Sequence, residues 1–243
     1  MMELFIVLLI IAVIVAVCYL CNKSSNDKAR EEIIERRKNF VSSKSPTARV
    51  IINNGTHLFY IDSERGYFGV DETDKTYDLK NIQSVNTYKD CITIIHNNDF
   101  LHIGRDPSKY DETVPLDILS VSLIAAVVLP VLKDNLHKKL AEYGVVPNFE
   151  YEHDGIIWGC DLNSKIFFST FGYIRLHPFS DLLSVNVEDL SSNTLYDGNY
   201  IINIAIKTMF DFDDDIDLTF YSKDAKYYDM LTMFKEIKKR GYK

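Results

Sequence analysis

Two ten-residue stretches, FYIDSERGYF at Phe59–Phe68 and WGCDLNSKIF at Trp158–Phe167, decide how this chain is organised. Each begins with an aromatic strand-like run, reaches an aspartate that opens a polar turn, and ends in a second strand-like run. The two stretches lie 99 residues apart. Self-similarity at a fixed spacing is typical of repeated structural units, and a repeat predicts further matches in the same register.

Two more matches follow in the same order. LKNIQSVN at Leu79–Asn86 matches FSDLLSVN at Phe179–Asn186 at an offset of 100 residues. LPVLK at Leu129–Lys133 matches LTMFK at Leu231–Lys235 at an offset of 102, and a basic cluster and a glycine follow both. Because three matches fall in register with few insertions, the sequence predicts two copies of one domain.

The two copies are expected at residues 47–146 and 147–243, each with several short strands followed by one closing helix. We therefore predict an α+β fold with two antiparallel sheets or barrels, each closed by a C-terminal helix. In the second copy the helix is expected to follow an N-cap at Ser222 and to end near Lys239. Its predicted core side consists of Ala225, Tyr228, Met230, Leu231, Phe234 and Ile237. The predicted strands of this copy are Gly155–Cys160, Lys165–Thr170, Tyr173–His177, Leu183–Glu188, Tyr200–Thr208 and Asp217–Tyr221.

The closing helix of the first copy leaves two alternatives. Residues 118–132 contain no charged side chain, which is compatible with membrane insertion. However, the run is shorter than the ~17 to 25 residues of a membrane span, Pro130 interrupts it, and Asp117 and Lys133 bound it closely. The alignment with the amphipathic helix of the second copy favours a buried helix between the two halves.

A roughly hundred-residue antiparallel sheet closed by one helix resembles the pleckstrin-homology (PH) architecture. The pattern carried by Asp62–Val85 and Asp161–Val185 is similar to that of bacterial PH-like proteins, many of them membrane-attached and without an assigned function. The resemblance covers nearly all of residues 48–243 and implies two tandem PH-like domains with no family-wide catalytic residues. In the turns after the first strands, Arg65 and Lys165 are single cations among acidic and polar residues, which disfavours phosphoinositide binding there.

The N-terminus predicts a transmembrane anchor at residues 1–21. Eighteen consecutive residues, Leu4–Cys21, carry no charge, and at about 1.5 Å rise per residue they span about 27 Å, close to the thickness of a bilayer core. A cleaved signal peptide would need a basic N-terminal region and a small-x-small cleavage site, whereas the chain has Glu3 and neither feature. The predicted anchor residues are Leu4, Phe5, Leu8, Ile11, Ile14, Cys18 and Leu20.

Basic residues follow the predicted anchor at positions 23–38, and none precedes it. By the positive-inside rule we expect a single-pass protein of a cell membrane, with its N-terminus outside and its body in the cytoplasm. Residues 22–46 are expected to form a charged juxtamembrane helix and a linker, without a coiled-coil seam. Cys18 and Cys21 follow Val and Leu, not the small residue of a lipoprotein signal. They are either sites of reversible acylation or plain apolar residues of the membrane helix.

Charge and cysteine content limit the partners. Of the net charge of −8, residues 1–43 carry +1 and the remainder −9. An acidic body repels polyphosphate, so we do not expect a nucleic-acid partner. Cys91 and Cys160 are widely separated in strand-like segments, which fits a reducing compartment, with a single bridge between them as the alternative.

Two groups of side chains were considered as metal sites. His96 and His102 flank a predicted hairpin turn and could face one another, but the sequence around them offers no metal motif, so surface histidines are favoured. The acidic run DFDDDID lacks the Gly and Glu of a calcium loop, because Ile216 and Ser222 occupy those positions. It is expected to be a solvated hairpin turn, with weak metal binding or partner docking as the alternative. The weak metal candidates in this run are Asp211, Asp213, Asp215 and Asp217.

Catalytic motifs are missing from the sequence, which contains no phosphate-binding glycine loop, no nucleophile elbow and no coherent catalytic set. We therefore expect no cofactor and no enzymatic activity, and keep a hydrolase using His96, His102 and residues 211–217 only as an outlier. The expected function is that of a membrane-anchored binding or scaffolding protein. Its partners are the bilayer, through the N-terminal helix, and another protein, through the body. The alternative is an immunity protein that neutralises a toxin or a phage component at the membrane.

Overall fold

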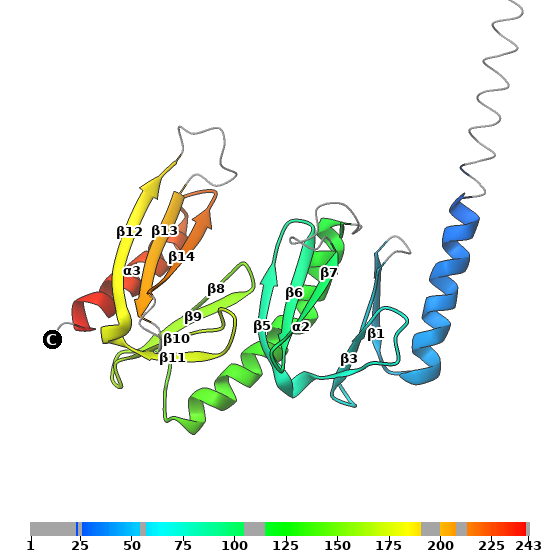
Figure 1. Ribbon diagram of the computed structural model, residues 1–243, viewed down its shortest axis with the longest axis horizontal. Coiled ribbons are helices and arrows are strands. Elements are labelled where there is room, and N and C mark those ends of the chain that lie inside the picture. The colour runs from blue at the N-terminus through cyan, green and yellow to red at the C-terminus, as the bar shows by residue number, and fades with distance from the viewer. Residues whose placement is uncertain are drawn as a thin grey trace, which may run out of the picture.

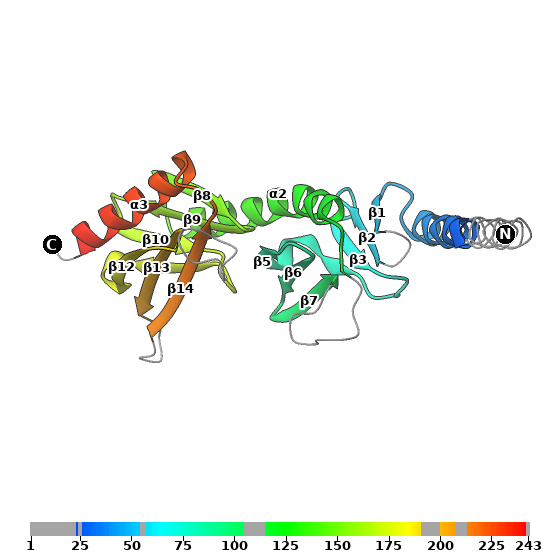
Figure 2. The ribbon, with the colours of Figure 1, turned by 90° about the horizontal axis from the view of Figure 1, so that it is seen from above.

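A computed structural model gives the fold of the chain after its N-terminal segment. It describes residues 23, 26–53, 57–104, 115–190, 200–207 and 213–241. Within these residues the chain forms three α-helices and four small antiparallel sheets, which confirms the predicted α+β class (Figure 1). The molecule is elongated, with helix 26–44 at one end and α3 (Ala225–Gly241) at the other (Figure 2). The predicted anchor, residues 1–21, lies outside the described residues.

The first half consists of a four-stranded sheet, a three-stranded sheet and α2 (Ile118–Glu142). The four-stranded sheet has the order β1-β2-β3-β4 and the three-stranded sheet the order β5-β6-β7, all antiparallel. A single 3-10 turn, η1 (Leu79–Asn81), joins the two sheets. The strands are β1 (Arg49–Asn53), β2 (His57–Asp62), β3 (Tyr67–Val70), β4 (Tyr77–Asp78), β5 (Ile82–Thr87), β6 (Cys91–His96) and β7 (Asp99–Gly104).

The second half shows the same order of elements: a four-stranded sheet β11-β10-β9-β8, the 3-10 turn η2 (Phe179–Asp181), a three-stranded sheet β12-β13-β14, and α3. Two of its strands were incompletely predicted. β8 was missed, and β14 begins four residues before the predicted Asp217, because its acidic start pairs with β13 and the pairing outweighs the low strand propensity of aspartate. The strands are β8 (Phe149–His153), β9 (Ile156–Asp161), β10 (Ile166–Ser169), β11 (Arg175–Pro178), β12 (Leu182–Asp189), β13 (Tyr200–Lys207) and β14 (Asp213–Phe220).

The start of α3 corrects one prediction. Asp224, not Ser222, caps the helix, because its carboxylate accepts a hydrogen bond from the Tyr227 amide at 3.0 Å. The predicted core side is correct for Met230, Leu231, Phe234 and Ile237, but Tyr227 is buried in place of Tyr228, which is exposed. Ala225, which was also predicted to face the core, is exposed. The buried side chains of α3 are Tyr227, Met230, Leu231, Met233, Phe234 and Ile237.

The matched LKNIQSVN and FSDLLSVN segments have the same local structure. Each starts with a 3-10 turn and continues into the first strand of a three-stranded sheet. Each strand has a register shift two residues in, between Ile82 and Ser84 in β5 and between Leu182 and Ser184 in β12. The corresponding residues therefore occupy corresponding positions in the two halves, down to the bulge.

A glycine–aromatic pair recurs in both four-stranded sheets with its members exchanged. In the first half Tyr60 of β2 lies opposite Gly69 of β3. In the second half Gly159 of β9 lies opposite Phe168 of β10. A Cβ atom on either glycine would overlap the opposing ring. In each pair the large ring lies over the glycine on the opposite strand and fills the space that the missing side chain leaves.

The helix α2 packs against both halves, but it is not the buried helix that the alignment favoured, because only 28% of its apolar window is buried. Its buried side chains recur every three or four residues along the helix, from Val121 to Leu140. They belong to one hydrophobic cluster that contains Phe68 and Ile92 of the first half and Phe168 of the second. The halves also meet directly, where the Asp154–Gly155 turn between β8 and β9 reaches β5 and the Thr87 amide donates to the Asp154 carbonyl at 2.9 Å.

Candidate functional site

The part of the structure closest to the predicted anchor is helix 26–44, which packs on the outer face of the first sheet. Val41 is buried against Leu58 and Tyr60, with Phe40 and Val50 beside them. Full burial of a large apolar side chain contributes roughly 1.5–3 kcal/mol to the free energy of unfolding. The helix is therefore part of the folded body and not a free linker.

Ion pairs also join helix 26–44 to the segment after β3. They orient the helix on the sheet more than they stabilise it. Arg36 lies 3.2 Å and Arg37 3.6 Å from the Glu72 carboxylate, and Lys44 pairs with Asp74. The Lys44 pair, which is also a hydrogen bond, lowers the pKa of Asp74 below its usual value. The Arg36 and Lys44 pairs are exposed on at least one side, and such pairs contribute between about 0 and 1 kcal/mol each, so the apolar contact dominates.

In each half a buried aspartate accepts hydrogen bonds from the segment that precedes the first strand. Asp62, at the end of β2, accepts hydrogen bonds from the Ser45 hydroxyl, from the Thr47 hydroxyl at 2.9 Å and from the Arg65 amide at 3.0 Å. The Ser45 hydrogen bond is the main cause of the lowered pKa of Asp62. This carboxylate links the segment after helix 26–44 to the first sheet.

Asp161, at the end of β9, has the same role in the second half. It accepts from the Val146 amide at 3.1 Å and from the Asn163 amide at 2.9 Å. Burial opposes ionisation, but these backbone donors outweigh it and lower the pKa of Asp161. The aspartate that opens the turn in each matched stretch is thus a structural hydrogen-bond acceptor.

The two predicted histidines do not face one another. His96 pairs with Asp99 across the hairpin, is buried, and hydrogen-bonds the Asp78 carbonyl at 3.1 Å. His102 lies opposite Thr93, whose hydroxyl is 2.9 Å from its ring nitrogen. Both rings therefore have local partners within the first half. The expected surface position is correct for His102, which is exposed, and wrong for His96, which packs in the core.

The acidic cluster lies in the second half, away from the sheet that carries both histidines. Asp211 is outside the described residues, and Asp213 is the first residue of β14. Asp215 and Asp217 are exposed on the same strand, and Asp217 accepts a hydrogen bond from Asn203 at 2.8 Å. The expectation of a hairpin turn is therefore wrong for residues 213–217, because they pair with β13. Among the residues that the structure describes, no three His, Cys, Asp or Glu side chains are grouped to hold a metal ion.

The described cysteines are Cys91 and Cys160, and neither forms a disulfide. Both thiols are buried. Burial raises the pKa of Cys160 to about 12. A thiol with such a pKa is protonated at neutral pH and is a poor nucleophile.

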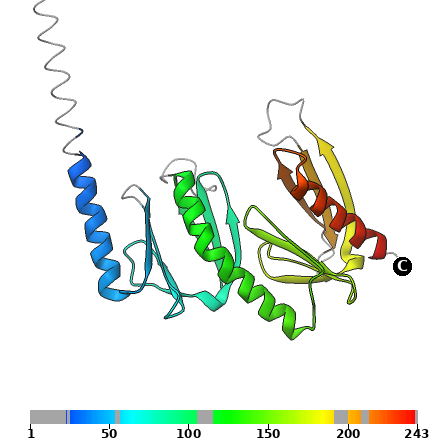
Figure 3. The same ribbon diagram turned by 180° about the vertical axis from the view of Figure 1, so that it is seen from behind.

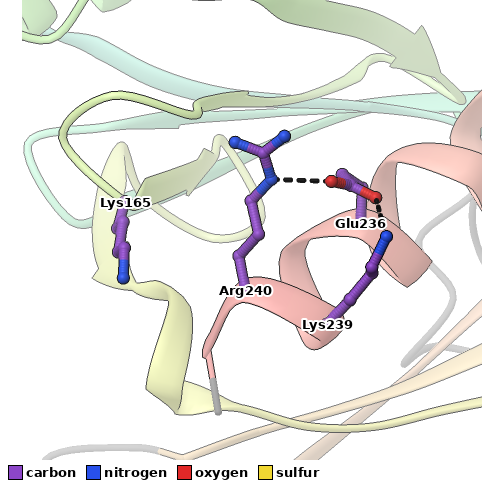
Figure 4. A pocket seen from close by; sticks show the side chains of 4 residues that line it. All are labelled: Lys165, Glu236, Lys239 and Arg240. Atoms are coloured by element: carbon purple, nitrogen blue, oxygen red, sulfur yellow. Dashed lines mark hydrogen bonds and ion pairs between the residues drawn. The ribbon is translucent and has the colours of Figure 1, made fainter. Parts of the chain in front are cut away.

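One basic hollow was not foreseen from the sequence. Lys165, in the turn before β10, lines a cavity of about 310 Å³ together with Glu236, Lys239 and Arg240 of α3. Figure 4 shows Arg240 paired with Glu236, at 2.6 Å, and Lys165 extending in another direction. Glu236 forms ion pairs with both Arg240 and Lys239, the second at 3.9 Å, so two of the three cations that line the hollow already have a carboxylate partner within it. More than seventy positions separate Lys165 from these helix residues, so no local pattern could have revealed the hollow.

A second cleft, of about 430 Å³, lies where α2 ends and the second half begins. Glu150 and His137 line the cleft, and their side chains lie 2.6 Å apart. Glu150 also lies 2.7 Å from Lys133, which does not line the cleft. Burial raises the pKa of Glu150, but its two partners lower the pKa by more than burial raises it, so the carboxylate remains ionised. This group joins α2 to β8, and Leu140 and Val145 supply the apolar lining.

Comparisons with known proteins gave no match: no family model matches the chain, and neither a curated protein nor a solved structure is similar to it at a significant level. Any functional argument therefore rests on the residues of this chain.

Proposed function

We propose that this chain is a single-pass membrane protein whose cytoplasmic body consists of two PH-like units and acts as a non-enzymatic binding or scaffolding module. The observation that carries the proposal is the docking of helix 26–44. This helix follows the uncharged run Leu4–Cys21 after a short connection, and it is packed on the first sheet through Val41. A membrane helix at residues 1–21 would then hold the body next to the bilayer.

The proposal of two PH-like units is supported by the repeated order of elements. Each half has a four-stranded sheet, a 3-10 turn, a three-stranded sheet and a closing helix. The register shifts in β5 and β12, the buried Asp62 and Asp161, and the exchanged glycine–aromatic pair all fall at matching positions. Independent convergence on the same details in the same order is a weaker explanation than duplication.

Protein binding is supported by the sheet edges. β7 and β12 are edge strands, and each exposes a large apolar side chain, Phe100 and Val187 respectively. An exposed edge with unpaired backbone groups can accept a strand from a partner, with such side chains giving specificity.

The experiment compares the full-length chain with a chain that starts at Lys23, each used as bait for crosslinking and capture from cells. A chain that starts at Lys23 lacks the predicted anchor but keeps helix 26–44. A chain that starts at Ser45 would also lose this helix, and Tyr60 would lose its contacts with Phe40 and Val41. Alkaline extraction and protease accessibility of the full-length chain are measured in the same membranes.

We expect the full-length chain to resist alkaline extraction, to be cleaved only from the cytoplasmic side, and to capture a protein partner that the chain starting at Lys23 captures less. Release by alkali would refute the anchor, and cleavage from the outer side would refute the orientation. If the captured partner is a toxin, the immunity function replaces the scaffold.

A further inference from the structure

The first two turns of α2 expose an apolar surface. Ile118 and Leu119 are 66% and 68% exposed, and Leu123, one turn later, is 45% exposed. At the corresponding start of α3 the exposed positions include Lys226 and Asp229. Both helices close a three-stranded sheet, so packing alone does not require the apolar surface of α2, and a second contact for it has to be sought.

This end of α2 lies at the same edge of the molecule as the N-terminal end of helix 26–44 (Figures 1 and 3). The uncharged run Leu4–Cys21 precedes that helix in the chain, so an anchor there brings this edge to the membrane surface. The exposed Tyr88–Lys89 turn belongs to the same edge, because the Leu116 amide donates to the Asp90 carbonyl at 2.7 Å. Tyrosine and lysine are both suited to the headgroup region.

A second membrane span would cost α2 its packing on the first half. Among the described residues, α2 is the one helix long and apolar enough to cross a membrane by length and composition, and 28% of its apolar window is buried. That buried fraction includes Val121, Ile124 and Val128, which face the first core. Further along, the Asn135 amide donates to the Leu79 carbonyl at 2.9 Å, and a transmembrane α2 would lose all these contacts. The exposed large apolar side chains of α2, Ile118, Leu119 and Leu123, lie in its first turns and are available to lipid without loss of this packing.

We propose that the N-terminal turns of α2, through Ile118, Leu119 and Leu123, insert into the interfacial layer of the bilayer that holds the anchor. The inference rests on the proposed membrane anchoring and adds to it a second attachment point. Figure 1 shows helix 26–44 and α2 on opposite sides of the β1–β4 sheet. Contact at both points fixes the tilt of the first half against the membrane, which a single anchor cannot do.

The test uses the full-length chain in vesicles of equal parts phosphatidylcholine and phosphatidylglycerol. Leu119→Trp places a fluorophore on the proposed contact, and Tyr228→Trp places one at an exposed position in the first turn of α3 as the matched control. The natural Trp158 is fully buried, and its emission in the unmodified chain is subtracted. Quenching is measured with phosphatidylcholine that carries a spin label near the top of its acyl chain, and flotation after alkaline washing reports the anchor separately.

We expect the spin-labelled lipid to remove most of the added emission of Leu119→Trp and little of that of Tyr228→Trp. If the chain floats with the vesicles but both variants are quenched equally little, the anchor stands and the bilayer contact of α2 is refuted. If the chain is lost on alkaline washing, the proposed anchoring itself fails. A third outcome is that the added emission of Leu119→Trp is protected from a water-soluble quencher but is not quenched by the spin-labelled lipid. If dilution with lipid then removes that protection, a second copy of the chain covers the surface and the inference is wrong.

Discussion

The exchanged glycine–aromatic pair gives the sharpest test of the packing. A Cβ atom at Gly69 would overlap the Tyr60 ring, and all three of its nearest atoms belong to that side chain. Tyr60 is fully buried beneath helix 26–44, so the ring has no free space to move into. We expect Gly69→Ala to lower the free energy of unfolding by about 1–3 kcal/mol, the usual cost of overpacking.

The cost should vanish when the ring is absent. In a Tyr60→Ala background, which itself costs about 3–5 kcal/mol, Gly69→Ala is expected to be neutral or to stabilise by roughly 0.5–1 kcal/mol, because alanine loses less backbone entropy than glycine. A Tyr60→Phe background keeps the ring and should keep the cost. The coupling energy between positions 60 and 69 is therefore about 1–4 kcal/mol.

The second half supplies a contrast. A Cβ atom at Gly159 would meet the Phe168 ring and also the Phe149 carbonyl oxygen at 2.5 Å. Because a backbone atom blocks this position, Phe168→Ala should not rescue Gly159→Ala. Urea unfolding of the full-length chain in detergent micelles, followed by circular dichroism, measures all variants. Equal destabilisation by Gly69→Ala with and without the Tyr60 ring would refute the packing argument.

Three further predictions concern other contacts. Gly155→Ala should destabilise the junction between the halves by about 1–3 kcal/mol, because the backbone has φ of +83° and the new Cβ would lie 2.6 Å from the Val85 carbonyl oxygen. Faster hydrogen exchange of the Thr87 amide in the variant is the readout, and unchanged exchange would contradict the contact. Asp62→Asn should destabilise the chain at neutral pH. The pKa of Asp62 is lowered by folding, so its stabilisation is complete above the unfolded value of about 3.9 and is lost as the pH falls through the lower folded value. Unfolding midpoints of the two chains should converge below about pH 4, and a constant gap would argue against the assignment. Cys160, buried and with a pKa of about 12, should react with thiol reagents at pH 8 only after unfolding in urea. Rapid labelling of the native chain at this position would disprove its burial.

Much of the fold was visible in the sequence because hydrophobic periodicity and turn residues are local signals. The strands β9, β10, β12 and β13 lie within a few residues of the predicted ranges. β8 was missed, since its residues, FEYEH, alternate apolar positions with acids over only five residues.

The candidate sites were less predictable, because they depend on contacts between distant residues. The spacing of His96 and His102 suggested a facing pair, but the register of β6 and β7 places Asp99 and Thr93 opposite them. The hollow beside Lys165 needs the end of α3 to pack beside the turn before β10, and no local rule specifies that contact.

The sequence by itself determined the uncharged N-terminal run, the acidic body, and the order in which strands and closing helices follow one another, because each of these depends on residues close together in the chain. Only the tertiary structure decided that helix 26–44 is docked on the first sheet and that the first turns of α2 remain exposed. Those features depend on which apolar faces meet. A chain with several similar apolar faces does not encode their pairing in any single segment, so it is fixed only when the whole core packs.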